Sequence, residues 1–85
     1  MKNQLENLLV ELATDLQKSG KKDTAQFFLT TKDNLSNGKN ITDLKEILEQ
    51  LMRSGAITQY GDFSFKQEAL FDKIYEAAKV YKESL

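Results

Sequence analysis

Hydrophobic residues recur at intervals of three and four along most of the 85-residue chain. Four segments show this spacing, which gathers apolar side chains on one face of an amphipathic helix. We predict helices over residues 3–19, 23–36, 41–54 and 65–84. The first two connections are only a few residues long, and short connections favour antiparallel neighbours. The pattern therefore predicts a single all-α domain, an antiparallel four-helix bundle of up-down-up-down order.

Residues that favour helix ends stand at the borders of these segments. The pairs expected to cap a helix start are Asn3 with Glu6, Asp23 with Gln26, and Ser64 with Gln67. The third helix is expected to begin at Asn40 or Thr42, and Gly20 is expected to stop the first. The capping residues and the hydrophobic periodicity thus predict the same four helices.

The connection over residues 56–63 is longer than the others, and half of its residues are apolar or aromatic. In one interpretation Ile57, Tyr60, Phe63 and Phe65 fold back and plug one end of the bundle, because a small domain has a thin core. In the other, Tyr60 and Phe63 are aromatic anchors of a binding surface. The sequence favours the plug and leaves the surface open as an alternative.

Acidic residues recur every four positions on the fourth predicted helix, at Glu68, Asp72 and Glu76. A similar run on the third helix consists of Asp43, Glu46 and Glu49. If the two faces adjoin, they form a negative patch that suits a cationic partner. The sequence favours the other interpretation, a mixed and solvated surface, because the bases Lys45, Arg53, Lys73 and Lys79 stand close enough to neutralise much of the patch. The candidate partner-binding residues are Tyr60, Phe63, Glu68, Asp72 and Glu76.

Composition argues against several kinds of chemistry. The chain contains no histidine and no cysteine, so the commonest general base and the commonest metal ligands are absent. Glu11 and Asp15 are four residues apart but off the apolar face, and we expect them to point to solvent with ordinary acid–base properties. We therefore expect no catalytic residues, no metal and no cofactor.

The distribution of charge and hydropathy bears on location and partners. The chain has a net charge of −1 and so lacks the excess of basic residues that is typical of a dedicated nucleic-acid-binding protein. The start, Met1 to Glu6, does not read as a signal peptide, and no apolar run approaches the roughly 18 residues of a membrane span. We expect a cytoplasmic protein without a membrane span.

One stretch in the last third of the chain has a distinctive pattern: Ala56-Ile57, then Phe63-Ser64-Phe65-Lys66-Gln67-Glu68, then Leu70, Ile74 and Ala77-Ala78. It resembles the end of the small immunity proteins that protect lactic acid bacteria from pediocin-like bacteriocins. The resemblance implies a cytoplasmic antiparallel four-helix bundle of about this length. This chain is mildly acidic where many members of that family are basic, and no functional residue is carried over from the family.

The expected function is a non-catalytic protein-binding module of immunity or antitoxin type that captures a protein or peptide, with a cationic one favoured. The alternative is a small winged-helix-like transcriptional regulator that uses the third helix for recognition. That helix carries only Lys45 and Arg53 as bases, a poor surface for phosphates. A third option is a homodimer through the leftover apolar residues Leu29 and Val80.

Overall fold

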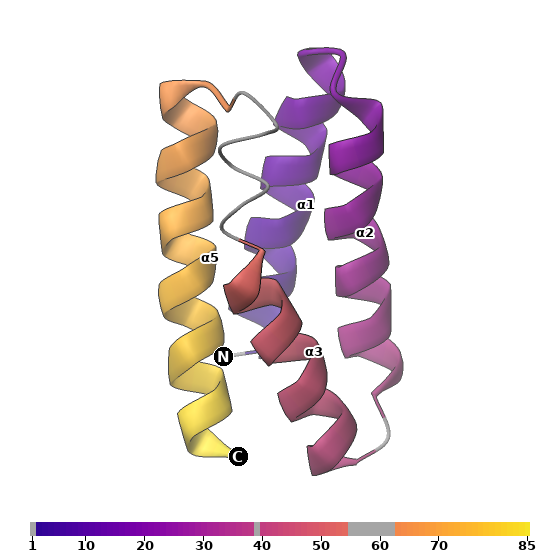
Figure 1. Cartoon of the computed structure of the whole chain (residues 1–85), viewed down its shortest axis with the longest axis vertical. Coiled ribbons are helices and arrows are strands. Elements are labelled where there is room, and N and C mark those ends of the chain that lie inside the picture. The colour runs from indigo at the N-terminus through magenta and orange to yellow at the C-terminus, as the bar shows by residue number, and fades with distance from the viewer. Residues whose placement is uncertain (1, 39, 55–62) are drawn as a thin grey trace.

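The computed structural model describes residues 2–38, 40–54 and 63–85. Within these residues the chain forms four helices, labelled as in Figure 1: α1 (Lys2–Lys18), α2 (Lys22–Asn37), α3 (Ile41–Arg53) and α5 (Phe65–Ser84). The prediction of an all-α, four-helix fold is confirmed, and every predicted boundary lies within one residue of the observed one. The up-down-up-down order of the helices stays a prediction.

The helices pack around one shared core. Helix α1 contacts α2 on one side and α5 on the other, and α3 contacts both α5 and α2 (Figure 1). In the described part of the chain, no helix is long and apolar enough to cross a membrane. Two contrasting regions lie along the pair formed by α1 and α5.

Leucines of α1 supply one wall of the core. Four of them are fully buried: Leu5, Leu9, Leu12 and Leu16. Burial of one such side chain contributes about 1.5–3 kcal/mol relative to exposure. Phe28 of α2 faces them and is also fully buried, with its ring 6.1 Å from that of Phe71 in an edge-on arrangement. The predicted apolar stripes of the helices therefore meet in the core.

Two of the predicted helix starts are confirmed. The Asn40 side chain accepts a hydrogen bond of 2.9 Å from the backbone N–H of Asp43. At the start of α5, the side chain of Ser64 accepts from the backbone N–H of Gln67, and the Gln67 side chain accepts from the backbone N–H of Ser64. Gly20, with φ of +80°, ends the first helix in a left-handed turn that glycine adopts without strain.

Two other predicted caps are wrong. Asn3 lies inside α1, and the Glu6 carboxylate accepts a hydrogen bond of 2.9 Å from the Ser36 hydroxyl at the end of α2. Helix α2 begins at Lys22 without a side-chain cap, so Asp23 stands in its first turn. A carboxylate in the first turn still stabilises a helix through the helix dipole. Local pattern therefore located these helix starts to within one residue but assigned the wrong side-chain partners.

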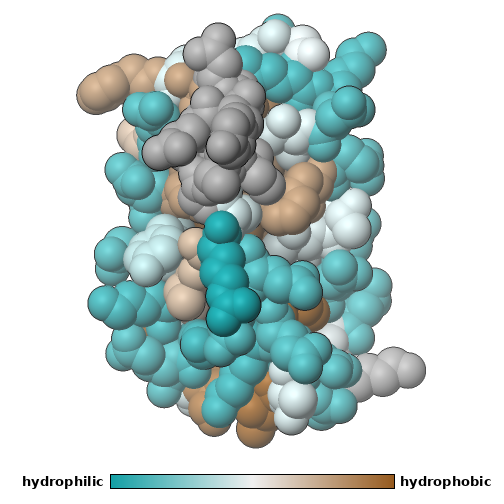
Figure 2. Space-filling view, in the orientation of Figure 1, coloured by the Kyte–Doolittle hydropathy of each residue, from teal (hydrophilic) through white to brown (hydrophobic). Residues whose placement is uncertain are grey.

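The two interpretations of the aromatic connection can be compared at its last residues. Phe63 is only 8% exposed and packs its ring 6.3 Å from that of Phe28, as the plug predicts. Phe65 is 89% exposed, so its assignment to the plug is wrong. Figure 2 shows hydrophobic surface projecting at the corner of the bundle where α5 begins. Ile57 and Tyr60 lie outside the described residues.

Candidate protein-binding groove

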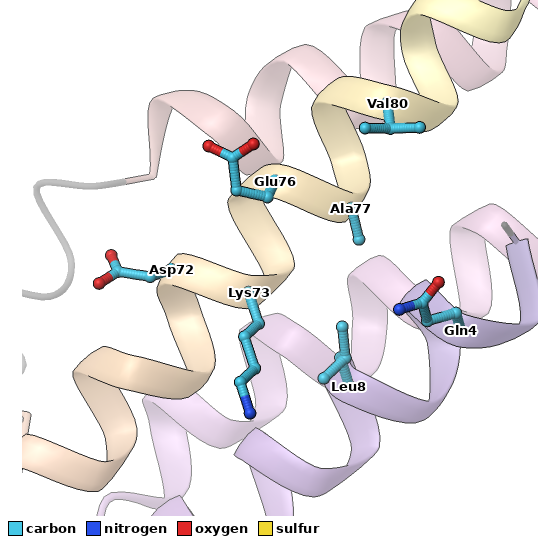
Figure 3. A pocket seen from close by; sticks show the side chains of 7 residues that line it. All are labelled: Gln4, Leu8, Asp72, Lys73, Glu76, Ala77 and Val80. Atoms are coloured by element: carbon cyan, nitrogen blue, oxygen red, sulfur yellow. The ribbon is translucent and has the colours of Figure 1, made fainter.

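A groove of about 700 Å³ runs between α1 and α5. Its lining comes from two turns of α1 and three of α5: Gln4, Leu8, Asp72, Lys73, Glu76, Ala77 and Val80 (Figure 3). The lining positions on α5 are separated by one, three or four residues, which is the spacing of one helix face. The groove therefore lies lengthwise along the seam between two helices.

The floor of the groove is apolar. Leu8 of α1 is directed toward Ala77 of α5, and both side chains are only partly buried (Figure 3). Val80, one turn further along α5, is 48% exposed. Ala77 is small, so it leaves a depression between the larger neighbours. The result is a strip of apolar surface that the bundle does not cover.

The rim of the groove is charged. Asp72 and Glu76 are exposed and project from α5 on the side away from α1, while Lys73 reaches toward α1 (Figure 3). Among the described residues neither carboxylate takes part in an ion pair. Two acids and one base leave the rim with an excess of one negative charge. Both carboxylates are thus available to a partner.

The remaining members of the predicted acidic faces lie elsewhere. Glu68 is exposed on the first turn of α5 and does not line the groove. Asp43 and Glu46 of α3 line a smaller hollow of about 300 Å³ beside the end of α2. Glu49 is paired with Lys82 of α5 at 2.9 Å, and this hydrogen-bonded ion pair lowers the pKa of its carboxyl. The structure therefore brings Asp72 and Glu76 together in one groove and leaves Glu68 outside it.

The aromatic candidates separate in a similar way. Phe63 is buried, with its ring against Phe28 and the Lys21 ammonium 5.9 Å from its centre, so it has almost no surface to offer a partner. Tyr60 lies outside the described residues. Of the five candidate binding residues, Asp72 and Glu76 are the ones whose surroundings suit a binding surface.

At the opposite end of the α1–α5 pair the interface is closed by a buried amide. Gln67 is completely buried, and its Nε2 donates to Asp15 Oδ1 at 2.8 Å and to Ser19 Oγ at 3.0 Å. Its Oε1 accepts from the Ser64 backbone N–H at 2.9 Å and from Lys21 Nζ at 3.0 Å. Both donors and both acceptor positions of the amide are used. We call this set of five residues the Gln67 junction.

Asp15 does not point freely to solvent, which corrects the prediction made from helix position. Its carboxylate accepts from Gln67 and pairs with Lys66 at 3.1 Å. The hydrogen bond from Gln67, followed by that from Lys66, lowers the pKa of Asp15 below its ordinary value. A carboxylate with a lowered pKa is a weak base, so Asp15 suits a structural hydrogen bond better than proton transfer. Glu11 is exposed, as expected.

In comparisons with known proteins, no family model, no curated protein and no solved structure matches the chain. In the described part of the chain, no cluster of three or more carboxylates could hold a metal ion. The candidate site therefore rests on the geometry of the groove alone. Sequence reasoning missed Gln4 and Lys73 as part of it and treated Leu8 and Ala77 only as core residues.

Proposed function

We propose that the chain is a non-catalytic protein-binding module, acting in the cytoplasm, that captures a cationic protein or peptide at the α1–α5 groove. The observation that carries this proposal is the combination of an uncovered apolar floor with rim carboxylates that form no ion pair within residues 2–38, 40–54 and 63–85. Binding sites commonly join a concave apolar surface to a few polar groups that fix orientation. An immunity-type or antitoxin-type role, in which capture alone protects the cell, is the biological form that this proposal favours.

The charge at the rim of the groove favours a different protein, rather than a second copy of this chain, as the binding partner. A symmetric dimer through the groove would bring Asp72, Lys73 and Glu76 of both copies to one interface, where four carboxylates would face two ammonium groups, and the excess of like charge weakens association. A partner with lysine or arginine beside an apolar segment would instead pair with both carboxylates. Leu29, the other residue expected at a dimer seam, is partly buried against the core.

Site-specific photo-cross-linking tests the proposal. A photoreactive amino acid at Val80 stands at the groove, whereas the same amino acid at Thr30 stands on the exposed face of α2. In the cells that make the protein, we expect the Val80 position to give a discrete adduct with another protein and the Thr30 position to give none. The adduct should weaken in the double variant Asp72→Asn, Glu76→Gln. No adduct from Val80, or the same adducts from both positions, would contradict the proposal.

A further inference from the structure

The walls of the groove are helical ridges, and this shape limits what can occupy it. Asp72, Glu76 and Val80 follow each other at four-residue intervals along α5. At a rise of about 1.5 Å per residue, the eight steps from Asp72 to Val80 span roughly 12 Å, a little over two helical turns. Side-chain rows with this spacing accept the rows of another helix, which is the usual way in which helices pack.

Backbone hydrogen bonding also favours a helical occupant. An extended segment above Leu8, Ala77 and Val80 would lie on hydrocarbon that offers its backbone N–H and C=O groups no partner, and buried backbone groups without partners are costly. Extended peptides commonly bind by adding a strand to a sheet edge, and the described residues form no strand. A helix satisfies its backbone internally and needs only side-chain contacts with the groove.

The charges at the rim determine which charged side chains the bound helix must carry. Asp72 and Glu76 are one turn apart, so they form an acidic row beside the apolar strip. A helix whose apolar face fills the groove would place the borders of that face against this row. Lysine or arginine at those borders would pair with both carboxylates, whereas glutamate would be repelled. Exposed pairs of this kind contribute only about 0.2–1 kcal/mol each, and like charges placed against each other oppose binding.

From these observations we infer that the α1–α5 groove binds a basic amphipathic helix of its partner, with apolar residues on the Leu8–Ala77–Val80 strip and basic residues against Asp72 and Glu76. This inference rests on the proposed function and narrows it to one class of partner. The bound helix would add a fifth helix to the bundle, seated over the seam that α1 and α5 leave uncovered.

Three synthetic peptides of 18 residues test the inference by fluorescence anisotropy with the intact chain. The first contains leucine and lysine at helical spacing. The second has the same composition with leucine and lysine alternating, which suits an extended strand. The third has helical spacing with glutamate in place of lysine. We expect the first to bind at least about tenfold more tightly than the other two, and to gain helical circular dichroism on binding.

Variants locate the binding and control for general attraction between opposite charges. The double variant Asp72→Asn, Glu76→Gln should bind the first peptide about 2- to 30-fold more weakly, which corresponds to two exposed ion pairs. Glu68→Gln removes an acid from the same helix outside the groove and should change the affinity less than twofold. Unfolding of each variant by heat verifies that the fold is intact.

The outcomes separate the inference from the proposed function. Equal affinity for the alternating peptide would overturn the helical occupant, and equal affinity for the glutamate peptide would overturn the basic one. Dimerisation of the chain through Val80 would overturn both. A cross-linked partner at Val80 together with failure of the first peptide would overturn the inference and leave the proposed function standing. Binding of the first peptide without any cellular adduct at Val80 would contradict the proposed function.

Discussion

The two ends of the α1–α5 interface differ in where their polar side chains lie. At the Gln67 junction a completely buried amide makes four hydrogen bonds, three of which join α5 to the end of α1 and to the turn that follows it. At the groove the polar groups stay in water, and apolar residues are left partly uncovered instead. Along one helix pair, then, one end is closed by satisfied polar contacts and the other end remains accessible.

This difference shows which end maintains the fold and which end is free to do something else. Removing a partner from a buried hydrogen-bonded group costs its desolvation, about 1–3 kcal/mol for each group left unpaired. Substituting an exposed polar residue usually changes stability by less than about 0.5 kcal/mol. Substitutions at the junction should therefore affect folding, and substitutions of the rim carboxylates Asp72 and Glu76 should affect binding with little effect on folding.

The largest effect is expected from Gln67→Ala. It removes the amide from the junction, half of the capping box and the bond to Asp15, so we expect the free energy of unfolding to fall by about 2–3 kcal/mol. Urea denaturation measures this change. Gln17→Ala on the exposed face of α1 is the matched control and should change stability by less than about 0.5 kcal/mol. Equal losses in the two variants would show that the junction does not stabilise the fold.

A smaller effect is expected from Ser64→Ala. The substitution removes the side-chain oxygen that caps α5 but leaves the Gln67 amide in place, so the loss should be about 1 kcal/mol. The double variant Ser64→Ala, Gln67→Ala should lose less than the sum of the two single losses, because the residues share one capping box. Strict additivity in urea denaturation would contradict a shared role.

Acidification should weaken the junction through Asp15. The pKa of Asp15 is lower in the folded chain than its ordinary value of 3.8, chiefly because Gln67 and Lys66 bond to the ionised form. Its contribution to stability is therefore complete above about pH 5 and is lost as the pH falls through 3.8 and then through the lowered folded value. The stability of Asp15→Asn should vary less with pH over that window. Parallel curves for the variant and the unmodified chain would be the contrary result.

The smallest effect on folding is expected at the groove. The double variant Asp72→Asn, Glu76→Gln removes two like charges four residues apart on α5, which should stabilise the chain by at most about 0.5 kcal/mol. Thermal unfolding measures this change. A loss of more than about 1 kcal/mol would mean that the carboxylates serve the fold, and the contrast between groove and junction would disappear.

Local sequence pattern predicted the helices well because each depends on residues close in the chain. The capping box of Ser64 and Gln67 is an example, since its partners are three residues apart. Gln67 also shows the limit of reasoning from local pattern. Gln67 also bonds to Asp15 and Ser19, 52 and 48 residues away, and nothing in the spacing of either residue indicates that contact. For this reason the sequence predicts a solvent-exposed Asp15, whereas the structure places Asp15 at the junction.

The groove was only partly predictable for a related reason. The acidic row of Asp72 and Glu76 is visible as a four-residue repeat, and Val80 stands out as an apolar residue off the main stripe. Whether two helices close over their shared seam depends on side-chain volumes from both, here the small Ala77 opposite Leu8. The thin core of a small domain predicts Phe65 in the plug, yet the capping box places Phe65 in the first turn of α5 with its side chain outward.

Nuclear magnetic resonance of the isotope-labelled chain tests the central contrast most directly. On titration with the helical leucine–lysine peptide, we predict that the methyl signals of Leu8, Ala77 and Val80 shift together along one binding curve. The side-chain amide signals of Gln67 should stay in place, because the junction is closed and fully hydrogen-bonded. Shifts at Gln67 without shifts at the three groove methyl groups would contradict the account.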